Sequence, residues 1–181
     1  MELYRFSPIK SNEGLFEAIK HIHFACFKLC KQSFNAYLPV AGNMGVFCHD
    51  TDEYKFLTSL RTELTVPSDN PNQKYFQLLI PLMIPAGGDV PETTYTHLYI
   101  RKPDPYRAQV GDVDFVLDID KYTELKNSLL AGTIIQGARL FERTDLDMVE
   151  LYDFDIDVLA YVSPREMTEK VRIKLSDATN L

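Results

Sequence analysis

The chain has 181 residues, of which 45% are hydrophobic and 25% charged, as in ordinary globular proteins with a full core. Its net charge of −7 argues against a nucleic-acid binder and against docking on anionic membranes, because both functions need clustered Lys and Arg. The three cysteines lack regular spacing, and the first residues lack the apolar core of a signal peptide. The longest apolar tract, residues 78–86, is far shorter than a membrane span of about 20 residues. We therefore expect a soluble cytoplasmic protein.

The N-terminal part is expected to form a short strand followed by a long helix. Residues 2–6 alternate apolar and polar side chains, which is typical of a strand. Ser11 is a suitable N-cap for a helix that ends near Phe34, with acidic residues near its start and lysines near its end. The side chains expected on its core face are Phe16, Ile19, His23, Cys26, Phe27, Cys30 and Phe34.

Four further elements are expected before residue 102. Residues 46–49 are predicted to form a strand introduced by glycines, and residues 52–64 a second helix. After a loop rich in turn-forming residues, the segments 74–84 and 93–101 are predicted to be strands. The first half therefore contains a strand, a helix, a strand, an inserted helix and two more strands.

The second half has the clearest pattern of elements. Residues 112–118 alternate apolar and acidic side chains with the period of two expected of a half-buried strand. Residues 119–131 change to helical spacing, and Gly132 follows where a helix end favours a residue with positive φ. Three short strands are then predicted at residues 138–142, 147–152 and 156–162.

We therefore predict a single α+β domain with a mixed or antiparallel sheet built from two βαβββ-like halves. The halves comprise residues 1–102 and 110–162, and the first contains the inserted helix. The tail, residues 163–181, is charged and polar, and it is interpreted as a frayed terminus or as an edge strand near residues 171–175.

The segment 152–161, Tyr-Asp-Phe-Asp-Ile-Asp-Val-Leu-Ala-Tyr, together with the doubled βαβββ order, resembles the vicinal oxygen chelate superfamily. This superfamily includes glyoxalases, extradiol dioxygenases and bleomycin-resistance proteins. Its members often carry Asp-Pro-Asp-Gly-Asn before the last strand, followed by a metal-binding Glu. Asp153 and Asp155 match the two aspartates, but Phe and Ile replace Pro and Gly, and Ala160 stands in place of the Glu. The resemblance implies the fold, and its departures fall on the residues that carry the metal chemistry.

A metal-dependent enzyme of the glyoxalase or dioxygenase type is the alternative hypothesis. His97 lies on a predicted strand, and Glu150 follows 53 residues later on another, a separation that suits a metal-binding pair if the halves fold together. Asp112 and Asp114 lie two apart on a strand and share a face, as carboxylates that bind a divalent cation must. The enzyme would use His97, Glu150 and Asp114. The simpler interpretation is a hydrogen-bonded strand histidine beside solvated acidic strand faces.

A second possible metal site lies on the long helix. His23, Cys26 and Cys30 share one helix face, and Cys48 and His49 on the next strand would complete a set of zinc ligands. The alternative is that the cysteines are small buried apolar residues and that His23 is a hydrogen-bonded core histidine. No Cys-x-x-Cys pair is present and phenylalanines surround the group, so we expect these side chains in the core.

The loop Arg101-Lys-Pro-Asp-Pro-Tyr-Arg107 is the most distinctive candidate for recognition. Its two prolines fix the backbone, and Arg101, Tyr106 and Arg107 present cations and an aromatic ring in an acidic chain. These three residues are predicted to bind an anionic small molecule or an acidic protein segment. In a purely structural loop, Arg107 would instead pair with Asp104 or Asp112.

Motifs that specify a catalytic mechanism are absent from the sequence. It contains no Gly-x-Ser-x-Gly, no His-Glu-x-x-His, no phosphate-binding loop and no Gly-x-Gly-x-x-Gly. The leading hypothesis is therefore a small ligand- or partner-binding module without catalysis and without a cofactor, with a divalent metal as the alternative.

Overall fold

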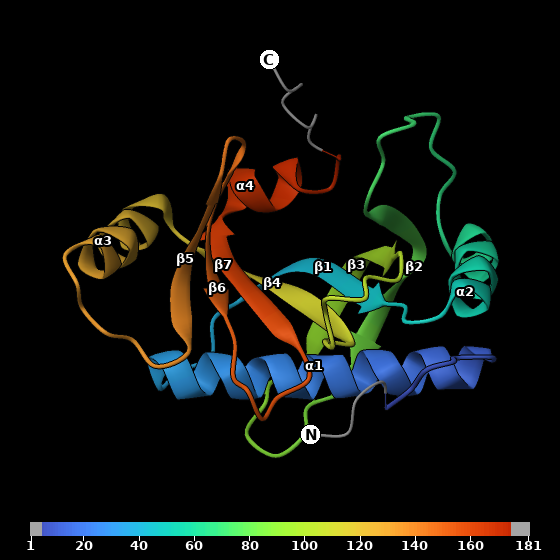
Figure 1. Ribbon diagram of the computed structural model, residues 1–181, viewed down its shortest axis with the longest axis horizontal. Helices are drawn as coiled ribbons and strands as arrows, with labels where there is room; N and C mark the ends of the chain where they lie inside the picture. The colour runs from blue at the N-terminus through green and yellow to red at the C-terminus, as the bar shows by residue number, and fades with distance from the viewer. Residues whose placement is uncertain (1–4, 175–181) are drawn as a thin grey trace.

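The protein, described by a computed structural model over residues 5–174, is an α+β fold with a mixed sheet, which confirms the predicted class (Figure 1). Four helices and seven strands form in this part of the chain. The helices are α1 (Asn12–Phe34), α2 (Thr51–Leu64), α3 (Ile119–Leu130) and α4 (Arg165–Lys170). The strands are β1 (Val40–Phe47), β2 (Phe76–Ile84), β3 (Thr93–Arg101), β4 (Gly111–Leu117), β5 (Ala138–Arg143), β6 (Leu146–Leu151) and β7 (Leu159–Pro164).

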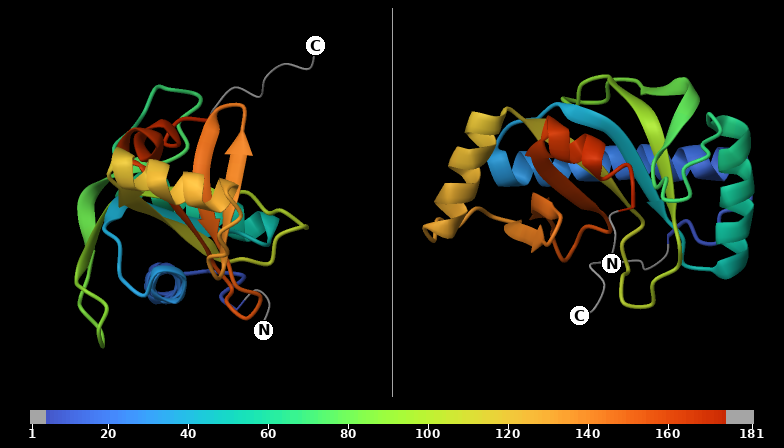
Figure 2. Two further views of the ribbon diagram at one scale, coloured as in Figure 1. Left: turned by 90° about the vertical axis from the view of Figure 1, so that its left-hand side faces the viewer. Right: turned by 90° about the horizontal axis from the view of Figure 1, so that it is seen from above.

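The strands form one sheet in the order β2-β3-β1-β4-β7-β6-β5. At its centre β1 and β4 run antiparallel, and each is parallel to its other neighbour, β3 or β7. The two outer pairs, β2 with β3 and β5 with β6, are antiparallel. Helix α1 covers one face of the sheet, α4 lies on the other face, and α2 and α3 flank opposite ends (Figures 1 and 2).

The second half is a complete βαβββ unit, formed by β4, α3, β5, β6 and β7 in that order. The first half is shorter than predicted by one strand, since it consists of β1, α2, β2 and β3, and α1 precedes it. The predicted strand at residues 2–6 falls mostly outside the described residues, and Arg5 and Phe6 form a turn. Helix α2, which was predicted as an insertion, is therefore the crossover helix of this half.

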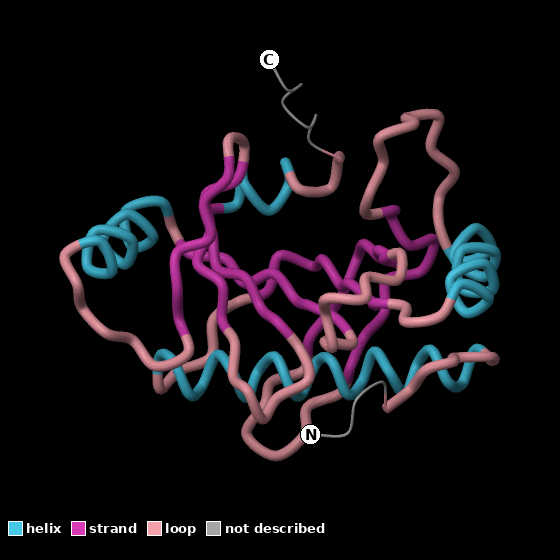
Figure 3. The backbone as a smooth tube through the Cα atoms, in the orientation of Figure 1, coloured by secondary structure: helices cyan, strands magenta, loops and turns pink. Residues whose placement is uncertain are grey.

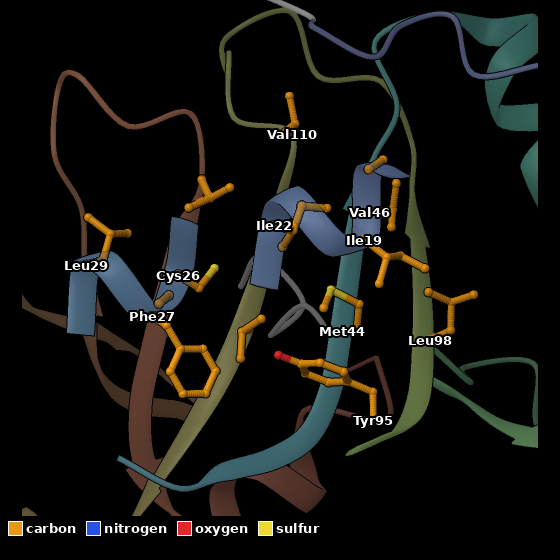
Figure 4. Packing of buried hydrophobic residues seen from close by; sticks show 14 of the residues in the cluster. Ile19, Ile22, Cys26, Phe27, Leu29, Met44, Val46, Tyr95, Leu98 and Val110 are labelled. Carbon is orange, nitrogen blue, oxygen red and sulfur yellow. The ribbon is translucent and has the colours of Figure 1, made fainter. Parts of the chain in front are cut away.

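Helix α1 begins and ends as its sequence predicts. The Ser11 hydroxyl accepts a hydrogen bond from the Gly14 amide at 3.0 Å, and Asn35 ends the helix in the left-handed conformation with φ 52°. The helix buries apolar side chains such as Leu15 against the sheet, and Figure 4 shows several of them facing β1 and β3. Phe16 is 43% exposed, so the predicted core face is rotated slightly. Each fully buried Leu, Ile or Phe contributes about 1.5–3 kcal/mol to folding.

The tail contains a helix, α4, that the sequence pattern does not predict. Strand β7 ends at Pro164 and α4 follows directly, resting on β4, β7, β1 and β6. After α4, Ile173 forms an isolated bridge with Gln73 of the α2–β2 loop. The edge-strand interpretation therefore applies to a single bridge, and the tail beyond residue 174 lies outside the described residues. None of the helices in residues 5–174 has the length and hydrophobicity of a membrane span.

Candidate functional site

A cleft opens on the sheet face that lies away from α1. Its deep part has a volume of about 310 Å³ and rests on the strands, and an outer part of about 850 Å³ adjoins it and shares several lining residues. Four separate segments form its walls: residues 71–74 of the α2–β2 loop, residues 101–107 after β3, the β5–β6 turn at 143–146, and residues 171–174 after α4. Most of these segments are drawn as pink loops on the side opposite α1 in Figure 3.

Cationic side chains line the cleft. Lys74, Arg101, Arg107 and Arg143 border its deep part and come from three different segments. Lys74 lies 4.9 Å from the Tyr99 ring centroid, and the Arg143 guanidinium lies 4.9 Å from a phenylalanine ring. Cations from distant parts of an acidic chain therefore gather at one site.

The predicted recognition loop is held by one carboxylate. Asp104 accepts a hydrogen bond from Arg101, lies 3.8 Å from Arg107 Nε, and accepts another hydrogen bond from the Tyr106 amide at 3.0 Å. Arg107 therefore pairs with Asp104, as expected for the structural alternative of this loop. Both arginines still line the deep part of the cleft, and Tyr106, 94% exposed, lines the outer part. Their role in ligand binding stays a prediction.

Two carboxylates form part of the floor. Asp112 and Asp114 are 6% and 3% exposed, so the solvated-face interpretation is wrong for this strand. They alternate along β4 with Val113 and Phe115, which face α1. Both line the deep part of the cleft because α4 and the surrounding loops cover the face on which they lie.

Neighbouring groups fix the two carboxylates in different ways. Asp114 Oδ2 accepts a hydrogen bond from Asn43 Nδ2 at 2.7 Å, and Asp112 Oδ1 accepts one from Tyr75 Oη at 3.3 Å. On β1, Gly45 lies directly opposite Asp112, and a Cβ atom there would lie 2.0 Å from Oδ1. A glycine at this position therefore makes room for the carboxylate.

Burial dominates the electrostatics of this pair. It raises the pKa of Asp112, and Lys74, Arg101 and Arg107 partly offset that effect. Burial and then the charge of Asp112 raise the pKa of Asp114 to about 7. Near neutral pH the two carboxylates therefore carry fewer than two negative charges.

Aromatic rings complete the walls of the deep part. The rings of Tyr75 and Tyr99 pack at a centroid distance of 5.2 Å, and those of Phe141 and Tyr161 at 5.5 Å. Tyr161 Oη donates a hydrogen bond to Glu150 Oε2 at 3.2 Å. Burial raises the pKa of both Tyr75 and Tyr161, so these phenols are neutral hydrogen-bonding groups.

The residues of the metal hypothesis lie on one sheet face but on separated strands. His97 is on β3, Asp114 on β4 and Glu150 on β6, with β1 and β7 between them. Glu150 is engaged by Arg139 and Tyr161, whereas burial lowers the pKa of His97 to about 4. Within residues 5–174, no three or more His, Cys, Asp or Glu side chains are arranged to hold a metal ion.

The side chains of the proposed zinc group lie in the core, which confirms the simpler prediction. His23, Cys26 and Cys30 are fully buried. The two thiols donate hydrogen bonds to the backbone carbonyls of Leu159 and Ala36, and His23 Nδ1 lies 2.8 Å from the Tyr95 hydroxyl. Burial raises the pKa of Cys30 to about 11 and lowers that of His23 to about 4, so both are neutral in the folded protein.

Several residues of the site were missed from the sequence. Lys74 stands at the start of the strand predicted at residues 74–84, and Arg143 directly follows the strand predicted at residues 138–142. Asn43 and Gly45 precede the strand that was predicted at residues 46–49, whereas the structure places both within β1. The only local signal was the Gly-Asn-Met-Gly run. Its meaning depends on the pairing of β1 with β4, which the sequence does not reveal.

Comparisons with known proteins show the fold alone. No family model matches the chain, and no curated protein sequence matches it. A solved structure titled "Structural Genomics, Protein EC4020" is 12% identical, covers 95% of this chain and 97% of that chain, and has a TM-score of 0.57. Two variants of Streptomyces coelicolor methylmalonyl-CoA epimerase in complex with 2-nitronate-propionyl-CoA are 17% identical and cover 70% of this chain and 98% of theirs, with a TM-score of 0.31. The likeness to the epimerase is too distant to support an argument.

Proposed function

We propose that the protein binds a small anionic molecule in the cleft. The observation that carries this proposal is the gathering of Lys74, Arg101, Arg107 and Arg143 around one cavity in a chain of net charge −7. In such a background, local positive charge attracts a small anion while the rest of the surface repels extended polyanions.

The shape of the cleft favours a small molecule over an acidic protein segment. The deep part is about 310 Å³, close to the lower end of ordinary ligand pockets, and its walls carry aromatic rings. Planar guanidinium groups suit carboxylate or phosphate oxygens, and Arg101 and Arg107 line this part. Tyr106 and Lys102 extend the binding surface into the outer part.

A binding role is supported better than the metal-dependent alternative. The oxygens of Glu150 are already used by Arg139 and Tyr161, and Asp114 is used by Asn43. Membership of the vicinal oxygen chelate superfamily is also proposed, on the strand order β4-β7-β6-β5 of the second half. Ala160 lies fully buried within β7, where that family would place its Glu.

Calorimetric titration with simple anions tests the proposal. The probes are phosphate, citrate, glucose 6-phosphate and 3-phosphoglycerate, measured with the wild type and with the double variant Arg101→Gln, Arg107→Gln. We expect the variant to lose about tenfold or more in affinity, since charge-assisted hydrogen bonds are the strong ones. The matched control is Lys55→Gln with Lys121→Gln, which removes equal charge from exposed positions outside the cleft.

Arg143→Gln provides a second test because its side chain forms no ion pair within residues 5–174. The proposal predicts weaker anion binding in this variant with unchanged folding. The proposal is wrong if none of the four anions binds, or if all variants bind as the control does.

A further inference from the structure

We infer that the buried Asp112 carboxylate is a second recognition element of the cleft, one that binds a protonated nitrogen of the ligand. This inference rests on the proposed function, and it defines the ligand as a small dipolar molecule. Its anionic group would meet the arginines of the cleft, and its ammonium or amidine-type nitrogen would meet Asp112 on the floor.

The first support is the hydrogen bonding of the buried carboxylates. Across residues 5–174, Glu53, Asp114, Glu150 and Asp157 each accept at least one hydrogen bond of 2.9 Å or shorter. Asp112 accepts only one, from Tyr75 at 3.3 Å, and its Oδ2 accepts none from any of these residues. An acceptor that lines the cleft and has no donor among these residues is available to a hydrogen-bond donor of the ligand.

The second support is the position of this carboxylate. Asp112 lines the deep part of the cleft, so its side chain is accessible to a bound molecule although it is nine-tenths buried. The absence of a side chain at Gly45 leaves the space that Oδ1 occupies. The Tyr75 hydroxyl holds the same oxygen, which leaves Oδ2 as the free acceptor.

The third support is the arrangement of charge. Lys74, Arg101 and Arg107 influence Asp112 through space, but none of them lies within 4.0 Å of it as an ion-pair partner. The two arginines are oriented toward Asp104 instead. Burial raises the pKa of both carboxyl groups, that of Asp114 to about 7, and the ionised carboxylate of Asp112 lies on the floor of the cleft without an ion-pair partner among residues 5–174. The floor thus attracts a cationic group, whereas the loop above it attracts an anion.

These features select a molecule that carries both charges a few bonds apart. Amino-sugar phosphates and phosphorylated amino acids have this chemistry and a size that fits the cleft. Two matched probe pairs isolate the contribution of the nitrogen. They are glucosamine 6-phosphate with glucose 6-phosphate, and O-phosphoserine with 3-phosphoglycerate, in which a hydroxyl replaces the ammonium.

Calorimetric titration of both pairs into the wild type and into Asp112→Asn tests the inference. In the wild type we expect the aminated member of at least one pair to bind about tenfold more tightly than its partner. Asp112→Asn should abolish that preference and leave binding of the hydroxyl analogue equal or stronger. The control Asp145→Asn removes the same charge from the outer part of the cleft and should keep the preference.

The outcomes separate this inference from the function on which it rests. Equal binding of aminated and hydroxyl probes to the wild type, with binding lost in Arg101→Gln, Arg107→Gln, overturns the inference and leaves the anion site intact. Binding of no probe overturns both. A preference that survives in Asp112→Asn also overturns the inference. If Asp112→Asn does not fold, the comparison of matched probes in the wild type decides.

Discussion

The two faces of the sheet are both buried, but they are built differently. On β4, Val113 and Phe115 pack under α1 among apolar side chains, whereas Asp112 and Asp114 point to the opposite face under α4 and the cleft loops. The α1 face is closed by one long helix. The cleft face is covered by short segments from four parts of the chain and keeps a cavity. We therefore expect stability to depend mainly on the first face and the proposed ligand binding to depend on the second.

The largest effect is expected from truncation of the α1 face. Phe115 is fully buried and packs edge-on against Phe27 at a centroid distance of 5.3 Å. Phe115→Ala should reduce the free energy of unfolding by about 3–5 kcal/mol, measured by urea denaturation. Ile134→Ala, at a position that is 94% exposed, should change it by less than about 0.5 kcal/mol. A loss below about 1 kcal/mol for Phe115→Ala would show that this face is loosely packed.

The acidic floor is expected to make stability depend on pH. The folded-state pKa of Asp114 is about 7, above its ordinary value of 3.8, so folding keeps a proton that the unfolded chain has lost. The contribution of Asp114 to the free energy of unfolding is therefore most favourable below about pH 4, and it is lost as pH rises to about 7. Asp112, whose pKa is also raised, acts in the same direction. His23 and His97 act in the opposite direction, because burial lowers the pKa of each from 6.5 to about 4. Their contribution to the stability of the folded protein is therefore lost as pH falls below 6.5.

The variant Asp114→Asn isolates the carboxylate from the histidines. Relative to the wild type, Asp114→Asn should have a higher free energy of unfolding at pH 8 than it has at pH 5, because only the wild type loses stability as Asp114 ionises. Between these two pH values the upper limit is about 2.7 kcal/mol, from roughly two pH units at about 1.4 kcal/mol each. Urea denaturation at both pH values measures it. A difference independent of pH would mean that Asp114 ionises normally in the folded protein.

A smaller effect is expected from filling the space beside Asp112. Gly45→Ala places a methyl group where the carboxylate oxygen lies, so we expect a loss of about 1–3 kcal/mol. Combining it with Asp112→Ala should recover part of that loss, because the clashing oxygen is gone. Strict additivity of the two changes in a double-mutant cycle would contradict the contact.

The smallest effect on stability is expected from the cleft arginines. Arg101 and Arg107 pair with the partly exposed Asp104, and such ion pairs contribute about 0–1 kcal/mol. Arg101→Gln with Arg107→Gln should therefore leave the melting temperature within a few degrees of the wild type, in contrast to Phe115→Ala. Unfolding of the double variant would show that the loop is a structural element.

The sequence predicted correctly those helices and strands that are determined by residues close to one another in the chain. The cap at Ser11, the strand β3 and the start of α3 were placed correctly, because capping chemistry and side-chain periodicity lie within a few residues. Strand β1 begins six residues before its predicted start, since Gly42, Asn43 and Gly45 are poor strand formers. Its pairing with β4 overrides that preference. Helix α4 was missed because it is short and the residues after it alternate as a strand would.

The site was predicted only in part for a similar reason. The sequence indicated the loop from Arg101 to Arg107 and the shared face of Asp112 and Asp114. It did not show that α4 and three distant loops cover this face, so buried acidic residues were interpreted as solvated. Lys74 reaches the cleft from more than twenty residues before Arg101, and no local pattern marks it.

Mapping a bound anion by nuclear magnetic resonance tests the central claim most directly. In a titration of ¹⁵N-labelled protein with glucosamine 6-phosphate, we predict that amide shifts change at Lys74, Arg101, Arg107, Asp112 and Arg143. The amides of α1 should stay unchanged. Shifts confined to other surfaces, or no change at millimolar probe, would contradict the account.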